Sequence, residues 1–226
     1  MTRMVPVSYE GEGGTAPARE APRRRRISIP VAALLVVAAL VCGYLVGRPG
    51  HPLESSADAG FLRDMSAHHA QAVDMSLIIM EETEEPTLDT VAYDITRTQQ
   101  AQIGRMQGWL ALWGLSARGT RPPMAWMAGH GHGSGGEPPE RMPGLATEEQ
   151  MQELREAEGE EAEILFLRLM TEHHLGGVDM AEAAVGLADE PIVVNFAKGM
   201  VTAQQSEIDL MADMLEERGA DPEGSY

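Results

Sequence analysis

The sequence predicts an all-α protein in which one transmembrane helix precedes a duplicated helical hairpin that forms a four-helix bundle. Three observations support this prediction: a charge-free apolar run near the N-terminus, a gapless internal repeat, and helical spacing of apolar residues within each repeat. The chain has 226 residues, with 15 methionines and only 4% aromatic residues. A core short of rings and rich in methionine is typical of helices packed through flexible side chains.

The apolar run extends from Ile27 to Gly47 and contains no charged residue. At about 1.5 Å per residue it reaches roughly 30 Å, the thickness of the hydrocarbon core of a bilayer. The preceding residues 1–26 are rich in Gly, Pro and Arg, which predicts a disordered arm. Four arginines at positions 23–26 predict that this arm is cytoplasmic and the C-terminal domain extracytoplasmic. We therefore expect a single-pass protein of the bacterial cell membrane.

Two other interpretations of this segment stay open. A cleaved signal peptide would use the small-x-small sequence at residues 57–59, which lies about ten residues beyond the apolar run. A lipid anchor on Cys42 would need a small residue before it, where the sequence has Val41. The run is longer than the apolar core of a signal peptide, so the sequence favours an uncleaved anchor.

The charge of the chain argues against one class of partner. The net charge is -18, and from Arg48 onward 11 basic residues stand against 32 acidic ones. Nucleic-acid binding needs a basic face, so no nucleic-acid partner is expected, whereas an acidic domain is compatible with collecting cations. The single cysteine, Cys42, excludes an internal disulfide framework and a cysteine-based zinc cluster. The sequence leaves a homodimer open.

A segment beginning at Phe61, FLRDMSAHHAQAVDM, returns at Phe166 as FLRLMTEHHLGGVDM, at an offset of 105 residues. The register holds without a gap, with 18 identities in 54 positions. Each unit is predicted to form helix, break, helix, because Pro86 and Pro191 suit the first turn of a helix and not its interior. One hairpin cannot bury its apolar face alone, so the two are predicted to pack together with approximate two-fold symmetry.

The predicted domain has a linker at 48–57 and a bundle at 58–220, composed of unit one at 58–115, a linker at 116–146 and unit two at 147–220. The first helix is expected from Asp58 to Glu84. Residues 147–150 have the form of a capping box, which predicts a short helix that starts at Thr147 and is ended by Gly159.

Both units place two histidines between two methionines on one helical face about 120° wide. Asp74 and Asp179 lie on the other side and are left out. Imidazole binds copper, zinc, iron and nickel, whereas thioether selects the softer Cu(I), so copper is the favoured cofactor. A di-iron site would need glutamates where these methionines stand. The predicted metal ligands are Met65, His68, His69, Met75, Met170, His173, His174 and Met180. Below about pH 6 the histidines are expected to protonate and release the metal.

Two further groups of residues are candidates for a supporting role. The inner face is also reached by Gln99, Gln204 and Glu207, which are expected to hydrogen-bond the histidine rings rather than to bind metal. The Gly-rich linker supplies possible soft-metal ligands at Met124, Met127, His130 and His132. The alternatives are a methionine stripe that is simply core and a linker that is a solvated loop.

These motifs resemble those of the bacterial family called domain of unknown function 305, a ferritin-like helical-bundle family. The resemblance rests on Met-x-x-His-His-x-x-x-Val-x-Met in both units, on Met142-Pro143-Gly144-x-Ala146-Thr147, and on Gln204-x-x-Glu207-Ile208-x-x-Met211. It covers residues 60–220 and implies a ferritin-like four-helix bundle. Some relatives are periplasmic copper-binding proteins that use Met and His. The chain departs from the pattern at Leu145, where relatives often carry Met, and at Gln102, where the second unit has Glu207.

The leading hypothesis is therefore a membrane-anchored protein that sequesters or transfers Cu(I) or Ag(I) outside the membrane. One alternative is a structural or interaction module whose histidines tie helices together. Another is a metal-dependent redox enzyme on a ferritin-like frame, but the sequence has no Glu-x-x-His pair, nucleophile elbow or dinucleotide-binding loop. No catalytic residue is assigned.

Overall fold

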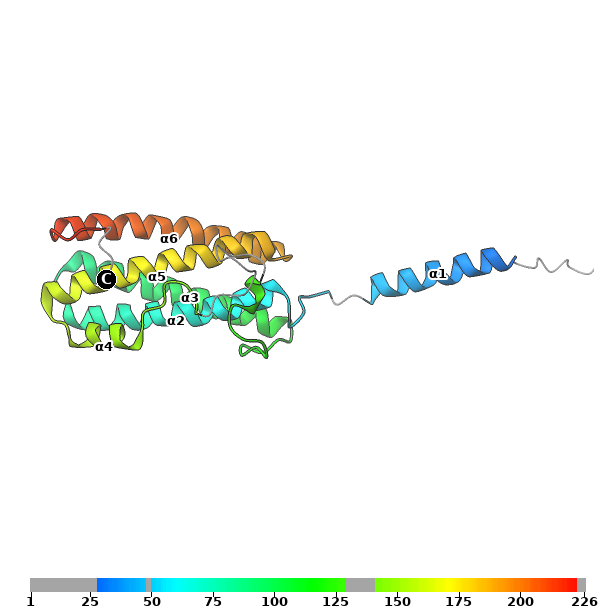
Figure 1. The fold of residues 1–226 in the computed structure, drawn as a ribbon, viewed down its shortest axis with the longest axis horizontal. Coiled ribbons are helices and arrows are strands. Elements are labelled where there is room, and N and C mark those ends of the chain that lie inside the picture. Colours follow the sequence, from blue (N-terminus) through cyan, green and yellow to red (C-terminus); the bar gives the residue numbers. More distant parts are fainter. Residues whose placement is uncertain (1–27, 48–49, 129–140, 223–226) are drawn as a thin grey trace, which may run out of the picture. The chain divides into compact units, whose positions relative to one another are not determined.

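The computed structural model of the chain describes residues 28–47, 50–128 and 141–222. These residues form six α-helices and one short 3-10 turn, and they contain no β-strand (Figure 1). The prediction of an all-α protein is confirmed. The chain divides into two compact regions, an N-terminal region at Met1–Arg48 and a C-terminal region at Pro49–Tyr226. Each region is described by itself below.

The N-terminal region contains helix α1, Ile29–Val46, an 18-residue helix with a mean hydropathy of 2.6. Pro30 lies in its first turn, where a missing backbone N–H costs nothing. The length and composition of α1 fit either a membrane anchor or a signal sequence. The arm predicted at residues 1–26 lies outside the described residues.

The C-terminal region contains α2 (Ala57–Glu82), α3 (Pro86–Leu112), α4 (Glu148–Glu156), α5 (Gly159–Leu187) and α6 (Pro191–Glu217). Helix α2 packs against α3, α5 against α6, and α2 against α5, so two hairpins meet through their first helices (Figure 1). The short helix α4 lies against α2 and α5.

The helix ends follow from local chemistry. Glu85 caps α3 by accepting hydrogen bonds from the backbone N–H groups of Thr87 and Leu88, and Pro86 opens the helix. The capping box predicted from Thr147 is present, since its hydroxyl and the Gln150 side chain each bond the other residue's backbone N–H. The prediction that Gly159 ends α4 was wrong.

Helix α4 instead ends at Glu156, and Gly159 opens α5 with a φ of 57°. A positive φ is unfavourable for residues with a Cβ, so a glycine at this position allows the tight junction between the two helices.

Each hairpin holds the other at its turn through an acidic side chain. The buried carboxylate of Asp58 in α2 accepts hydrogen bonds from the backbone N–H groups of Asp189 and Glu190, between α5 and α6. Glu163 in α5 accepts a hydrogen bond of 2.6 Å from the Thr83 hydroxyl, after α2. It also pairs at 2.8 Å with Arg218, which follows α6. Because Asp58 and Glu163 are offset by 105 residues, the two ends of the domain are fastened by equivalent positions of the repeat.

The apolar core is divided into two clusters. One cluster includes Met75 of α2 and Met170 of α5, and the other includes Met65 of α2 and Met180 of α5. This pairing means that α2 and α5 run in opposite directions. The polar residues between Met65 and Met75 of α2, and those between Met170 and Met180 of α5, therefore lie between the two clusters.

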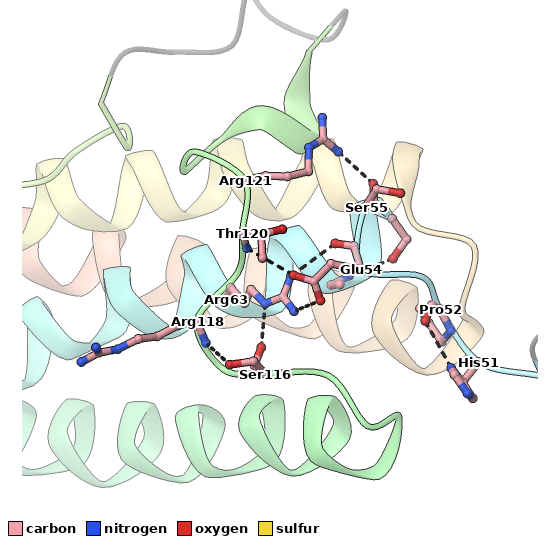
Figure 2. Close-up of polar contacts among 11 residues, drawn as sticks. His51, Pro52, Glu54, Ser55, Arg63, Ser116, Arg118, Thr120 and Arg121 are labelled. Atoms are coloured by element: carbon pink, nitrogen blue, oxygen red, sulfur yellow. Dashed lines mark hydrogen bonds and ion pairs between the residues drawn. The ribbon is translucent and has the colours of Figure 1, made fainter.

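The segment that follows α3 folds back onto the start of α2 (Figure 2). Arg63 of α2 is the centre of this contact, with hydrogen bonds to the backbone oxygen of Ser116 at 2.8 Å and to the carboxylate of Glu54 at 2.7 Å. Glu54 in turn accepts from the backbone N–H of Thr120, and Arg121 donates to the backbone oxygen of Ser55. These bonds fix the first part of the linker against the bundle.

Asp64 fixes the next part of the same linker. Its buried carboxylate accepts hydrogen bonds from the Met124 backbone N–H at 2.7 Å and from the Trp126 indole N–H at 2.9 Å. Met124 has a φ of 62°, which is uncommon for a residue with a side chain. The carboxylate therefore stabilises a turn that the local sequence does not favour.

Replacing Asp64 with alanine is expected to lower the free energy of unfolding by about 2 kcal/mol, because two buried donors lose their acceptor. Asp74 lies on the same helix but is exposed, so Asp74→Ala is the matched control and should change stability by less than about 0.5 kcal/mol. Urea unfolding followed by circular dichroism compares the two variants. Equal effects would show that the contact of Asp64 with the linker contributes nothing to stability.

Candidate functional site

Four histidines form a buried layer where α2 meets α5. His68 and His173, from equivalent positions of the two units, lie with ring centroids 3.8 Å apart and planes inclined by 34°. His69 lies 6.5 Å from His68, and His174 lies 6.1 Å from His173, again between ring centroids. All four side chains are fully buried. The structure thus brings the two predicted histidine pairs together.

The two central histidines each face a backbone carbonyl. The Nε2 atom of His68 lies 2.9 Å from the oxygen of Pro143, and that of His173 lies 2.9 Å from the oxygen of His68. A carbonyl oxygen can only accept, so each Nε2 carries the hydrogen and donates it. In the neutral ring the Nδ1 atom is then left with a free lone pair.

The two outer histidines each face a side-chain oxygen on the other helix of the same hairpin. His69 Nε2 lies 2.6 Å from Gln102 Oε1 on α3, and His174 Nε2 lies 2.7 Å from Glu207 Oε2 on α6. The Nδ1 atoms of all four rings are buried without a hydrogen-bond partner among the described residues. Four imidazole lone pairs are therefore held inside the domain, and buried polar atoms of this kind call for an explanation.

Burial keeps His68, His69 and His173 neutral. It lowers the pKa of His68 to about 4, despite the hydrogen bond to Pro143, and lowers that of His69 to about 3. The pKa of His173 is also held well below its ordinary value by burial and by the neighbouring histidines. The expected protonation near pH 6 is therefore too high for these three residues in the folded protein. At neutral pH their Nδ1 atoms need lose no proton to act as ligands.

The predicted methionine ligands lie on both sides of the histidine layer. Met65 and Met180 belong to one apolar cluster, and Met75 and Met170 belong to the other. All four are fully buried, so their thioethers are part of the core. Among the described residues, no group of three or more His, Cys, Asp or Glu side chains is arranged around one point.

The accessory glutamines do not make the hydrogen bonds expected of them. Gln99 and Gln204 are buried, yet neither amide is bonded to a histidine, and both amide atoms of Gln99 are without a partner in the described structure. Gln204 packs closely on Gly177, whose missing side chain leaves room for it. The expected role is filled by Glu207 for His174 and by Gln102 for His69. Sequence reasoning recognised Gln102 as the equivalent of Glu207 but did not assign it as the partner of His69, although the two spacings are equal.

A strap formed by residues 142–146 covers the histidine layer. Its Pro143 oxygen accepts from His68, and the Gln71 side chain bonds both the N–H and the carbonyl of Ala146, at 2.8 and 3.0 Å. Gly144, with a φ of 70°, and Gly176 of α5 have no side chains, which lets the strap touch the backbone of α5 directly. Sequence reasoning missed Gln71, Gly176 and the carbonyl of Pro143, because their partners are far away in the chain.

The predicted linker ligands are not gathered at the histidine layer. Met124 and Met127 are buried in the apolar cluster that contains Met65, and Met124 is positioned through Asp64. His130 and His132 lie outside the described residues.

Fold and site together define an all-helical protein whose two hairpins meet at a buried layer of paired histidines flanked by methionines. The family model of the domain of unknown function DUF305 matches residues 58–215, and the chain belongs to this family. A comparison with curated proteins finds no match.

Solved structures agree with this assignment. The chain is 47% identical to a DUF305 protein from Streptomyces coelicolor, over 77% of this chain and 100% of that one, with a TM-score of 0.69. It is 30% identical to a DUF305 fragment from Deinococcus radiodurans, over 71% and 96% of the two chains, with a TM-score of 0.59. It also shares its fold with CopM in the Cu(I)-bound form, at 24% identity over 71% and 96% of the chains, with a TM-score of 0.54.

Proposed function

We propose that the protein is a membrane-anchored, extracytoplasmic protein that sequesters or transfers Cu(I) or Ag(I) through its two Met-x-x-His-His motifs. The observation that carries this proposal is the set of four buried Nδ1 atoms that have no hydrogen-bond partner in the described part of the chain. Histidines that bind metal usually donate their other ring N–H to a carbonyl or carboxylate, which fixes the tautomer and orients the ring. Each of the four histidines has an oxygen acceptor at Nε2.

The choice of ion follows from the donors. Thioethers add little for zinc, which prefers imidazole, thiolate and carboxylate, but they suit Cu(I) and Ag(I). The four methionines next to the histidines in the repeat are fully buried around the layer. CopM, which shares the fold, has been solved in Cu(I)-bound, Cu(II)-bound and Ag-bound forms.

The architecture and location complete the proposal. We infer that the two hairpins arose by duplication and form a ferritin-like four-helix bundle, as the 105-residue register of the repeat indicates. We also infer that α1 remains as an anchor, with arginines 23–26 on the cytoplasmic side and the bundle outside.

One observation favours a second candidate, a structural role for the histidines. His68 donates to the strap and His173 donates to the backbone of α2, so both rings connect separate segments without any metal. In that case the domain would be an interaction module whose polar layer serves only to hold its parts together.

The test is a titration of the full chain, in detergent micelles, with Cu(I) and Zn(II) against competing chelators. We expect Cu(I) to bind far more tightly than Zn(II), and His68→Ala with His173→Ala to weaken Cu(I) binding on the order of 100-fold or more, because two imidazole ligands are lost. His51→Ala is the control, since His51 is exposed and outside the layer.

Each outcome of the titration separates the alternatives. Loss of helical circular dichroism in the double variant would identify the histidines as structural. Unchanged binding in a folded double variant would move the site to the linker, around Met124, Met127, His130 and His132. Absence of Cu(I) and Ag(I) binding by the wild-type chain would exclude the proposed function.

A further inference from the structure

The two outer histidines sit in the same geometry but have chemically different partners. His69 and Gln102 are separated by 33 residues in unit one, as are His174 and Glu207 in unit two. The distances from Nε2 to oxygen are 2.6 and 2.7 Å. One histidine therefore donates to a neutral amide and the other to a carboxylate, so a single chain contains both forms of the same contact.

The surroundings of the two contacts differ in the same sense. Residues 97–108 of α3 include two arginines and no acidic residue, whereas the equivalent residues 202–213 of α6 include three acidic residues and no basic one. Arg97 and Arg105 line one surface pocket together with Gln102. Asp209 and Asp213 are exposed on the same helix as Glu207. The half of the layer that contains His174 is thus the more negative one.

A carboxylate at Nε2 changes an imidazole as a metal ligand. The carboxylate accepts a strong hydrogen bond from the ring N–H. This bond raises the electron density at Nδ1 and makes the imidazole a stronger metal ligand. The carboxylate also brings a negative charge close to any ion held at Nδ1, and this attraction grows in proportion to the charge of the ion. An amide at the same place supplies the hydrogen bond without the charge.

From these observations we infer that the two histidine pairs are unequal half-sites, and that Glu207 raises the affinity of the His173–His174 half for the divalent ion Cu(II) more than for Cu(I) or Ag(I). The His68–His69 half, with Gln102, lacks this gain. Glu207 is a positioning residue that acts through His174. This inference rests on the proposed metal-binding function and adds to it a difference in ion charge between the two halves.

The experiment exchanges the partners in the full chain, in detergent micelles. We expect Glu207→Gln to weaken Cu(II) binding by about 10–100-fold and Cu(I) and Ag(I) binding by a clearly smaller factor, because monovalent ions carry half the charge. Gln102→Glu should strengthen Cu(II) binding. Glu207→Asp keeps the negative charge, so it should weaken Cu(II) binding less than Glu207→Gln does. Without metal, the ¹⁵N chemical shift of His174 Nδ1 should move toward that of His69 in Glu207→Gln.

Asp209→Asn is the matched control, since it removes the same charge from an exposed position of the same helix. Water screens that charge, so its effect on Cu(II) should stay below about threefold. An equal loss in Asp209→Asn and Glu207→Gln would overturn the assignment to Glu207. So would an equal loss of Cu(II) and Cu(I) in Glu207→Gln, or no change in either. Failure of the wild-type chain to bind any of these ions would instead overturn the proposed function and this inference together.

Discussion

Replacing Gly176 with alanine is expected to lower the free energy of unfolding by about 3 kcal/mol, the upper part of the usual range for overpacking. A Cβ at this position would overlap the carbonyl oxygen of Pro143 and would lie 2.7 Å from the backbone nitrogen of Gly144. Both atoms belong to the backbone of the strap, which cannot turn aside as a flexible side chain would. The strap would have to lift from α5, and the hydrogen bond from His68 to Pro143 would weaken with it.

Gly104→Ala is the matched control for this prediction. Gly104 lies in the middle of α3, is exposed, and has open space where a Cβ would be placed. Alanine is a better helix former than glycine, so this variant should gain up to about 1 kcal/mol. Urea unfolding of the two variants should therefore give shifts of opposite sign. A Gly176→Ala variant as stable as the wild type would show that the strap is not held against α5.

Acidification from pH 6.5 to 5 is expected to cost about 1.6 kcal/mol of stability for each of His68 and His69, and His173 adds a loss in the same direction. Their pKa values in the folded chain are lowered, to about 4 for His68, to about 3 for His69, and well below the ordinary value for His173. In the unfolded chain they return to about 6.5. Below pH 6.5 the unfolded state therefore binds more protons, and stability falls with pH.

The full contribution of these histidines is present above pH 6.5 and declines as the pH drops toward their folded pKa values. Asp64, whose pKa burial raises, acts in the opposite direction. The measurement is the slope of unfolding free energy against pH, from urea titrations between pH 5 and 7. His69→Asn should reduce this slope, because this residue no longer takes up a proton on unfolding.

A stability that does not change between pH 7 and 5 would contradict this prediction. It would mean that the buried rings gain protons in the folded state nearly as easily as in the unfolded one, for example because water reaches the layer.

The helices could be predicted from the sequence because their signals are local. Pro86 and Pro191 mark the start of α3 and α6, and the capping box at Thr147 marks the start of α4. The ends were harder to predict. Helix α3 stops at Leu112, three residues before the predicted end of unit one, and Gly114, with a φ of 71°, completes the turn that follows.

The histidines of the site could also be predicted, since a repeat shows which side chains recur in one register. What could not be predicted is the partner of each ring. The His68 to Pro143 contact joins residues 75 apart, and the His173 to His68 contact joins residues 105 apart. Such contacts depend on how helices and strap pack in three dimensions, and no local pattern encodes them. The exception is the contact of His69 with Gln102, because the equivalence of Gln102 and Glu207 is visible in the repeat.

The polar layer between two apolar clusters also limits how the two hairpins can be aligned. If α5 slid by one turn along α2, the imidazoles of one helix would face hydrocarbon on the other, and the bond from His173 to the oxygen of His68 would be lost. Unpaired buried polar groups are costly, so neighbouring staggers of these two methionine-rich helices are penalised. Methionine cores adapt easily to shifted packings, which makes such a penalty more useful here than in a rigid core. The buried histidines thus favour a single alignment of the two hairpins, whether or not an ion is bound.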